Sequence, residues 1–208
     1  MNRTPRWTAC AILVALSLAG CAAPPLRLYT LGASSVSADA RPLPRGAPVM
    51  KVDRLILPDA IDSDDIVRRD GDILKRSPTG RWASRLSLLA TDLVTSRIAM
   101  RAPNTLVTDQ WPARTPDYRL VIHVSRLDVT SQGKALLDAE WEIFSRNARR
   151  HPARGRVQVT LSGPDGTDRD VATLDSALFE RLADAIDVPG GSGKRELASE
   201  KSSSAAAD

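Results

Sequence analysis

Apolar and polar residues alternate along two neighbouring stretches in the second half of the chain. The alternation runs through residues 118–130 and again through 135–145, with Gln132-Gly133-Lys134 between them. A period of two places the apolar side chains on one face of a strand, so this pattern predicts two antiparallel strands joined by a turn. A charged turn at 146–154 and a third run at 156–161 follow, and the three strands are expected to form a meander.

Shorter apolar runs in the first half predict further strands. One covers residues 26–31, and another covers 49–57 after a loop rich in Ser, Ala and Pro. The second run carries apolar residues on both faces, which favours burial on both sides. The turn signal Asp70-Gly71-Asp72 predicts a hairpin with strands at 64–69 and 73–76.

The longest helical pattern covers residues 81–101, between the break at Ser77-Pro78-Thr79-Gly80 and Pro103. Its apolar positions recur at helical spacings, which predicts one buried stripe. That stripe consists of Trp82, Leu86, Leu89, Leu93 and Met100. A core position for Trp82 is preferred to a role as a ligand-binding aromatic residue.

A second helix is predicted at residues 176–186, with Asp175 or Ser176 as its N-cap. Its buried face is expected to carry Leu178, Leu182 and Ile186. Residues 169–174 are predicted to be a short strand that pairs back on the meander. The elements together predict an α/β protein of the α+β type, in which a mixed, largely antiparallel sheet packs against two main helices in a single domain.

The first 20 residues have the layout of a secretory signal peptide. Arg3 and Arg6 precede an apolar run that is about half as long as the roughly 20 residues of a membrane-spanning helix. Leu18-Ala19-Gly20-Cys21 then resembles a bacterial lipobox, so Cys21 is the predicted site of lipid attachment through a thioether. An ordinary secreted protein with a chance cysteine at this position is the less favoured alternative.

These signals divide the chain into four segments. Residues 1–20 are the signal peptide, 21–25 the lipidated tether and 26–187 the folded domain. Residues 188–208 consist mainly of Gly, Ser, Ala, Lys and Glu and are expected to be a disordered tail.

Cysteine and charge content exclude several classes of function. Cys10 leaves with the signal peptide and Cys21 is lipidated, so no thiol remains for a disulfide, a zinc site or a nucleophile. Without Arg3 and Arg6 the 29 basic side chains fall to 27, against 25 acidic ones, so the mature chain is nearly neutral. The sequence pI of about 9.4 would suggest nucleic acid for a cytoplasmic protein, but export excludes that partner.

Candidates for catalysis or metal binding are few. His123 lies in an alternating strand, where a core or sheet-surface position is favoured, and His151 lies in the charged turn. The sequence lacks a Gly-Xaa-Ser-Xaa-Gly elbow, a Gly-rich phosphate loop and a His-Glu-Xaa-Xaa-His motif. The aspartates between Asp59 and Asp72 lack the ligand spacing of a calcium loop. We therefore expect no enzyme activity, no cofactor and no metal.

The densest basic cluster lies in the charged turn. Arg149, Arg150 and Arg154 are candidate contacts for the phosphates of anionic lipid head groups. An exposed turn that is kept soluble by its charge is the alternative.

The order of several motifs resembles that of the ABC-type transport auxiliary lipoproteins. The resemblance covers most of the mature domain and depends on the lipobox, Tyr29-Thr30-Leu31, the run Val52 to Pro58 leading to Ile61 and Ile66-Val67-Arg68, Arg81-Trp82-Ala83, and the strands at 118–129 and 135–145. The chain departs from the family pattern at Ile61-Asp62-Ser63-Asp64-Asp65, where the family commonly has Leu-Asp-Arg, and after Trp82-Ala83, where it lacks Glu-Pro.

The resemblance implies a periplasmic lipoprotein that works with an ABC-type permease system and an MCE-domain protein in lipid transport between the two membranes. It implies a docking or end component and not the catalyst, and it makes a homo-oligomer that matches ring-forming partners plausible. Ala22 replaces the aspartate that retains lipoproteins in the inner membrane, which favours the outer membrane, with the domain facing the periplasm. A structural or assembly lipoprotein of a secretion system or envelope scaffold is the alternative function.

Overall fold

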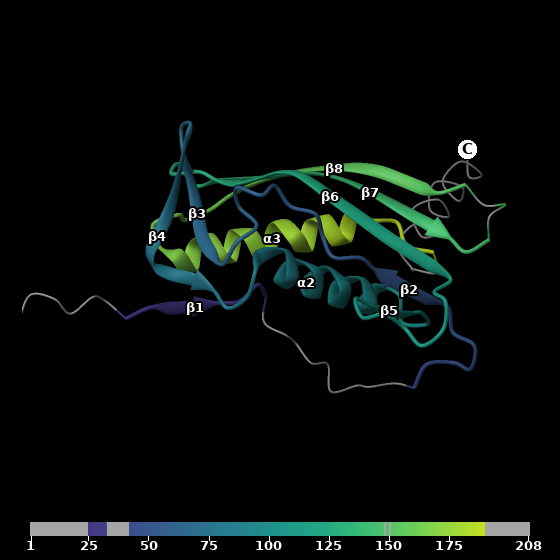
Figure 1. The fold of residues 1–208 in the computed structure, drawn as a ribbon. Coiled ribbons are helices and arrows are strands. Elements are labelled where there is room, and N and C mark those ends of the chain that lie inside the picture. The colour runs from purple at the N-terminus through teal and green to yellow at the C-terminus, as the bar shows by residue number, and fades with distance from the viewer. Residues whose placement is uncertain (1–24, 33–41, 148, 150, 190–208) are drawn as a thin grey trace, which may run out of the picture.

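A five-stranded sheet forms one layer of the molecule (Figure 1), in a computed structural model that describes residues 25–32, 42–147, 149 and 151–189. Its strand order is β5-β2-β6-β7-β8. The strands are β2 (Val49–Val52), β5 (Leu106–Thr108), β6 (Tyr118–Val129), β7 (Lys134–Ser145) and β8 (Ala153–Ser162). Strands β6, β7 and β8 are antiparallel neighbours, which confirms the predicted meander, whereas β2 runs parallel to β5 and β6.

A β-bulge explains why the apolar pattern of β6 changes phase. Leu120, Ile122 and Val124 are buried at even positions, whereas Leu127 and Val129 are buried at odd ones. The register with β7 shifts between Val124 and Arg126. The extra residue at this point keeps both sets of side chains on the core face of the sheet.

Strand β2 is shorter than the predicted run at 49–57. All four of its residues are buried, which confirms burial on both faces. Beyond it, Ile56 forms only an isolated bridge to His123 and is 50% exposed. Strand β5 was not predicted from the sequence, because three residues are too few to show a period.

A second sheet has the strand order β1-β4-β3. Strands β3 (Asp65–Asp70) and β4 (Ile73–Trp82) form the predicted hairpin, and β1 (Arg27–Tyr29) pairs with β4 in parallel. The second hairpin strand is six residues longer than expected and passes through Ser77-Pro78-Thr79-Gly80. Its far end is held by the Trp82 amide, which donates to the Asp64 carbonyl at 2.7 Å.

The long helix α2 (Leu86–Arg101) therefore begins five residues later than predicted. Trp82 belongs to the end of β4 and is only 2% exposed, which confirms the core position. The predicted helix stripe is confirmed in part: Leu86 is buried and Leu89 and Leu93 pack partly buried against the core, but Met100 is 54% exposed and does not belong to it. The stripe also missed the small residues of the buried face, which consists of Leu86, Ser87, Ala90, Thr91, Val94, Thr95 and Ile98. Small side chains let the backbone approach its neighbours closely, and they escape a search for large apolar residues.

Helix α3 (Asp168–Ala185) contains the segment 169–174 that was predicted to be a strand. Its start is fixed by a capping box, in which Thr167 Oγ1 accepts from the Asp170 amide and the Asp170 carboxylate accepts from the Thr167 amide. The predicted buried positions Leu178, Leu182 and Ile186 are confirmed, all being fully buried. Both helices lie on the same face of the five-stranded sheet (Figure 1), and one core fills the space between these layers.

The α+β class, the mixed strand pairing and the single domain agree with the prediction, but the strands form two sheets and not one. The predicted signal peptide (1–20), Cys21 and the tail beyond residue 189 lie outside the described residues. Within the described part, no helix combines the length and apolarity needed to span a membrane.

Candidate functional site

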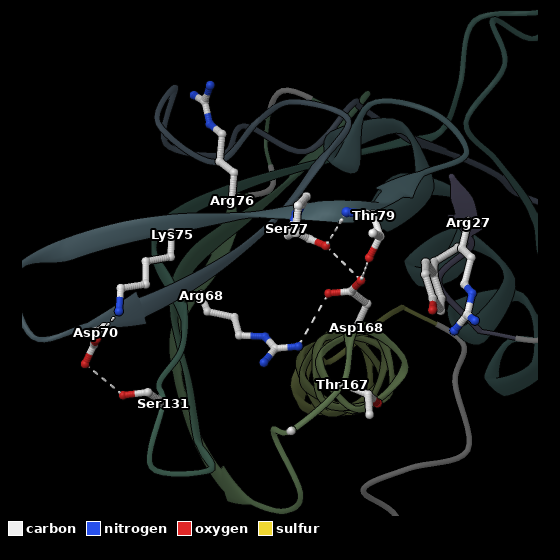
Figure 2. A pocket seen from close by; sticks show the side chains of 13 residues that line it. Arg27, Arg68, Asp70, Lys75, Arg76, Ser77, Thr79, Ser131, Thr167 and Asp168 are labelled. Atoms are coloured by element: carbon white, nitrogen blue, oxygen red, sulfur yellow. Dashed lines mark hydrogen bonds and ion pairs between the residues drawn. The ribbon is translucent and has the colours of Figure 1, made fainter. Parts of the chain in front are cut away.

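A cavity of about 600 Å³ opens where β1, the β3–β4 hairpin and the start of α3 meet (Figure 2). It also touches Ser131, in the turn between β6 and β7. Its volume falls within the 300–1,000 Å³ that is usual for small-ligand sites. Four segments far apart in the sequence therefore build one concave surface.

The Asp168 carboxylate is held at the centre of this cavity by the hairpin. It accepts hydrogen bonds from Ser77 Oγ at 2.8 Å and Thr79 Oγ1 at 3.5 Å, and an Arg68 guanidinium N–H reaches it at 3.4 Å. Gly80 makes this contact possible, because a Cβ at that position would lie 2.4 Å from Asp168 Oδ2. The hairpin and the start of α3 are thus joined through one acidic side chain.

A second carboxylate, Asp70, lies on the opposite wall (Figure 2). It forms an ion pair with Lys75 and accepts a hydrogen bond from Ser131 Oγ at 3.0 Å. These two partners, Lys75 first, lower the pKa of Asp70 below its ordinary value. Asp70 is therefore ionised at neutral pH.

Four basic residues border the cavity, and they differ in their partners. Arg68 and Lys75 face its two carboxylates, while Arg76 points away (Figure 2) and pairs with Asp65 at 3.1 Å. Arg27, on β1, is exposed, and its side chain forms no hydrogen bond or ion pair with the described residues. The cavity thus offers unpaired positive charge next to the strand that follows the predicted lipid anchor.

The predicted site residues lie elsewhere or outside the described chain. Cys21 and Arg150 belong to segments that the structure does not describe. Arg149 is exposed in the turn after β7, where its amide donates to Asn147 Oδ1 at 3.1 Å, and Arg154 is exposed on β8. Neither residue contributes to the cavity.

Part of the predicted basic cluster is already paired. Arg146 contacts Asp117 at 2.9 Å, and Arg156 pairs with Glu140 across β7 and β8. His123 is exposed on β6, as the sheet-surface interpretation expected, and His151 is exposed as well. The described residues contain no group of three or more His, Cys, Asp or Glu side chains that would hold a metal ion.

Sequence reasoning missed the cavity because its residues carry no motif. Ser77-Pro78-Thr79-Gly80 was interpreted only as a break, and Asp168 preceded a segment that was predicted to be a strand. The Thr167-Xaa-Xaa-Asp170 spacing was a usable signal, since a capping residue followed by an acid three positions later marks a helix start.

Two solved structures share this fold. One is an uncharacterised protein with a TM-score of 0.63 and 14% identity, which covers 77% of this chain and 95% of that chain. The other is protein XCC0632 from Xanthomonas campestris, with a TM-score of 0.56 and 16% identity over 76% of this chain and 90% of that chain. At this level of identity the likeness shows the fold alone. No curated protein matches the sequence.

A family model gives the decisive comparison. The model of the ABC-type transport auxiliary lipoprotein component matches residues 29–187, from the last residue of β1 to two residues beyond α3. The match covers most of the chain and includes both sheets and both helices. It agrees with the resemblance that the lipobox and the order of the motifs indicate, and the chain belongs to the ABC-type transport auxiliary lipoprotein family.

Proposed function

We propose that this protein is a periplasmic, membrane-anchored auxiliary lipoprotein of an ABC/MCE-type system that transports lipid between the inner and outer membranes. It acts as a docking or end component and has no catalytic role. The observation that supports this most directly is the family match over residues 29–187, which begins eight residues after the lipobox cysteine Cys21.

The short tether determines where the domain works. Five residues lie between Cys21 and Arg27, the first residue of β1. An extended chain spans at most about 3.5 Å per residue, so β1 starts within roughly 20 Å of the lipid-modified cysteine. Because Ala22 is not the retention aspartate, we place the anchor in the outer membrane and the domain in the periplasm.

The partner is tested by crosslinking in intact cells, followed by affinity purification of the full-length lipoprotein from solubilised envelopes. Recovery of an MCE-domain protein together with an ABC-type permease supports the proposal. Recovery of only secretion-system or cell-wall components contradicts it and favours an assembly lipoprotein. Native mass spectrometry of the same preparation measures whether the protein forms a homo-oligomer.

A further inference from the structure

The cavity beside β1 carries one more positive than negative side chain. Arg27, Arg68 and Lys75 border it, against the carboxylates of Asp70 and Asp168. The fourth basic residue of the lining is not counted, because it points away (Figure 2) and is paired outside the cavity. An anion with one negative charge would therefore balance this surface.

The two arginines have N–H donors to offer. The Arg27 side chain forms no hydrogen bond or ion pair with the described residues, although its backbone pairs with β4. Arg68 contacts Asp168 through a single nitrogen at 3.4 Å, which is a long contact. A guanidinium group binds phosphate oxygens with paired, charge-assisted hydrogen bonds. The helix terminus adds little, because the capping box and Asp168 already occupy the first turn of α3.

Exposed apolar side chains lie at and just before β1, next to the positive charge of Arg27. Leu26 and Leu28 flank Arg27 and are 58% and 65% exposed. A second hollow of about 580 Å³ lies between β1 and α3, is lined in part by Leu28, Ala172 and Ala177, and shares Tyr29 with the first. Strand β1 therefore has a cationic cavity and a partly apolar hollow next to each other, which suits a ligand with a charged head and a hydrocarbon tail.

We propose that the cavity between β1, the β3–β4 hairpin and the start of α3 binds the phosphodiester of a phospholipid head group, with Arg27 and Arg68 as its ligands. A phosphodiester carries a single negative charge, which matches the cavity, whereas a phosphate monoester carries about −1.5 to −2 at neutral pH. That the phospholipid comes from the membrane to which Cys21 anchors the protein rests on the proposed function. The binding of a phosphodiester by Arg27 and Arg68 does not depend on that function.

The test is isothermal titration of the full-length, lipid-modified protein in a non-ionic detergent. The probes are dihexanoylphosphatidylglycerol, below its own micelle-forming concentration, and inorganic phosphate. Arg27→Ala should weaken binding of the phospholipid about tenfold, which corresponds to ~1.4 kcal/mol. It should leave thermal unfolding unchanged, because the Arg27 side chain forms no hydrogen bond or ion pair with the described residues and the substitution keeps the backbone pairing with β4. Arg68→Ala should weaken binding in the same direction.

Arg45→Ala is the matched control, because Arg45 is another exposed arginine and does not line the cavity. It should bind like the unchanged protein. Unchanged binding by Arg27→Ala, or an equal loss with Arg45→Ala, overturns the assignment. Inorganic phosphate that binds as tightly as the phospholipid also overturns it. If the lipid binds but no MCE-domain protein is recovered from envelopes, the site stands and the proposed transport role fails.

Discussion

The carboxyl group of Asp175 lies in the apolar core, on the inner face of α3. It borders a small internal cavity of about 20 Å³ with Trp82, Leu127 and Val129, and Asp65 is the other acidic residue there. Its Oδ1 atom has no hydrogen-bond partner among the described residues. Burial raises the pKa of Asp175 from 3.8 to about 8, so the side chain is protonated at neutral pH.

This carboxyl group makes stability depend on pH. Because the folded-state pKa is the higher one, the unfolded chain releases a proton that the folded chain retains, and stability falls as pH rises from about 4 to about 8. Asp175→Asn removes this titration. As pH rises from about 4 to about 8, the unchanged protein should lose on the order of 5 kcal/mol of unfolding free energy that the variant does not lose. Urea unfolding at several pH values measures this. Asp59→Asn, in an exposed loop, is the control, and an identical pH profile for Asp175→Asn would contradict the raised pKa.

Substitution of Gly80 tests the contact between the β3–β4 hairpin and α3. An added Cβ would meet the Asp168 carboxylate, so Gly80→Ala must displace this side chain or the hairpin. Overpacking of this kind costs about 1–3 kcal/mol, which chemical unfolding measures. Gly166→Ala adds the same methyl group where its nearest contact, Asp170 Oδ2, is 4.0 Å away, and it should cost less. Equal stability of both variants would show that the close approach has no energetic role.

Single residues were predictable where burial followed from local pattern. Trp82 in the core and His123 on the sheet surface agree with the structure, because each depends on its immediate neighbours. The contact of Gly80 with Asp168 joins positions 88 residues apart, and no period or motif encodes it. The nearness of Arg27 and Arg68 in the cavity was missed for the same reason, since their strands, β1 and β3, are joined only through β4.

Among the elements, helix α3 depends on a local signal at its start. Thr167→Ala removes the hydroxyl that accepts from the Asp170 amide and should destabilise the protein by about 1 kcal/mol. Thr173→Ala is the matched control, because its exposed hydroxyl bonds only the Arg169 carbonyl within the same helix. Differential scanning calorimetry compares the two variants. A lower melting temperature for Thr173→Ala than for Thr167→Ala would argue against the capping box.

Element boundaries were least predictable where sheet pairing overrides local pattern. The helical spacing of Trp82 and Leu86 extended the expected α2 backwards, but pairing with β1 and β3 holds residues up to Trp82 in β4. The meander was predictable because β6, β7 and β8 are sequential neighbours. Parallel pairing of β2 with β6 brings together segments more than 60 residues apart, and alternation along one strand does not reveal it.

The whole molecule is held together by contacts between its two helices as well as by its core. Both Arg97 and Arg101, on α2, reach across to the last turn of α3. Arg97 forms two hydrogen bonds of 2.9 Å with the Asp184 carboxylate, and Arg101 donates to the carbonyls of Ala183 and Ile186. These contacts join the second half of α2 to the C-terminal end of α3, opposite the end of α3 that borders the cavity.

The proposed attachment of the molecule to the envelope depends on one side chain. Cys21→Ala removes the sulfur that is predicted to carry the lipid, so the protein should move from the membrane fraction to the soluble periplasmic fraction or remain as an uncleaved precursor. Fractionation and intact-mass measurement distinguish these forms. Arg45→Ala should fractionate like the unchanged protein. A mature Cys21→Ala protein that stays in the membrane fraction would contradict anchoring by lipid.

The pairing of β1 determines how a pulling force on the proposed lipid anchor would pass into the domain. The strand is held by three register pairs with β4, and hydrogen bonds follow it from the Ala83 amide to the Tyr29 carbonyl and from the Gly32 amide to Ser176 Oγ. If Cys21 anchors the protein as proposed, a docked partner that pulls the domain away from the lipid bilayer would load this strand first and, through its contacts, β4 and α3. The five-stranded sheet does not contain β1, so it lies behind these contacts in the path of the load.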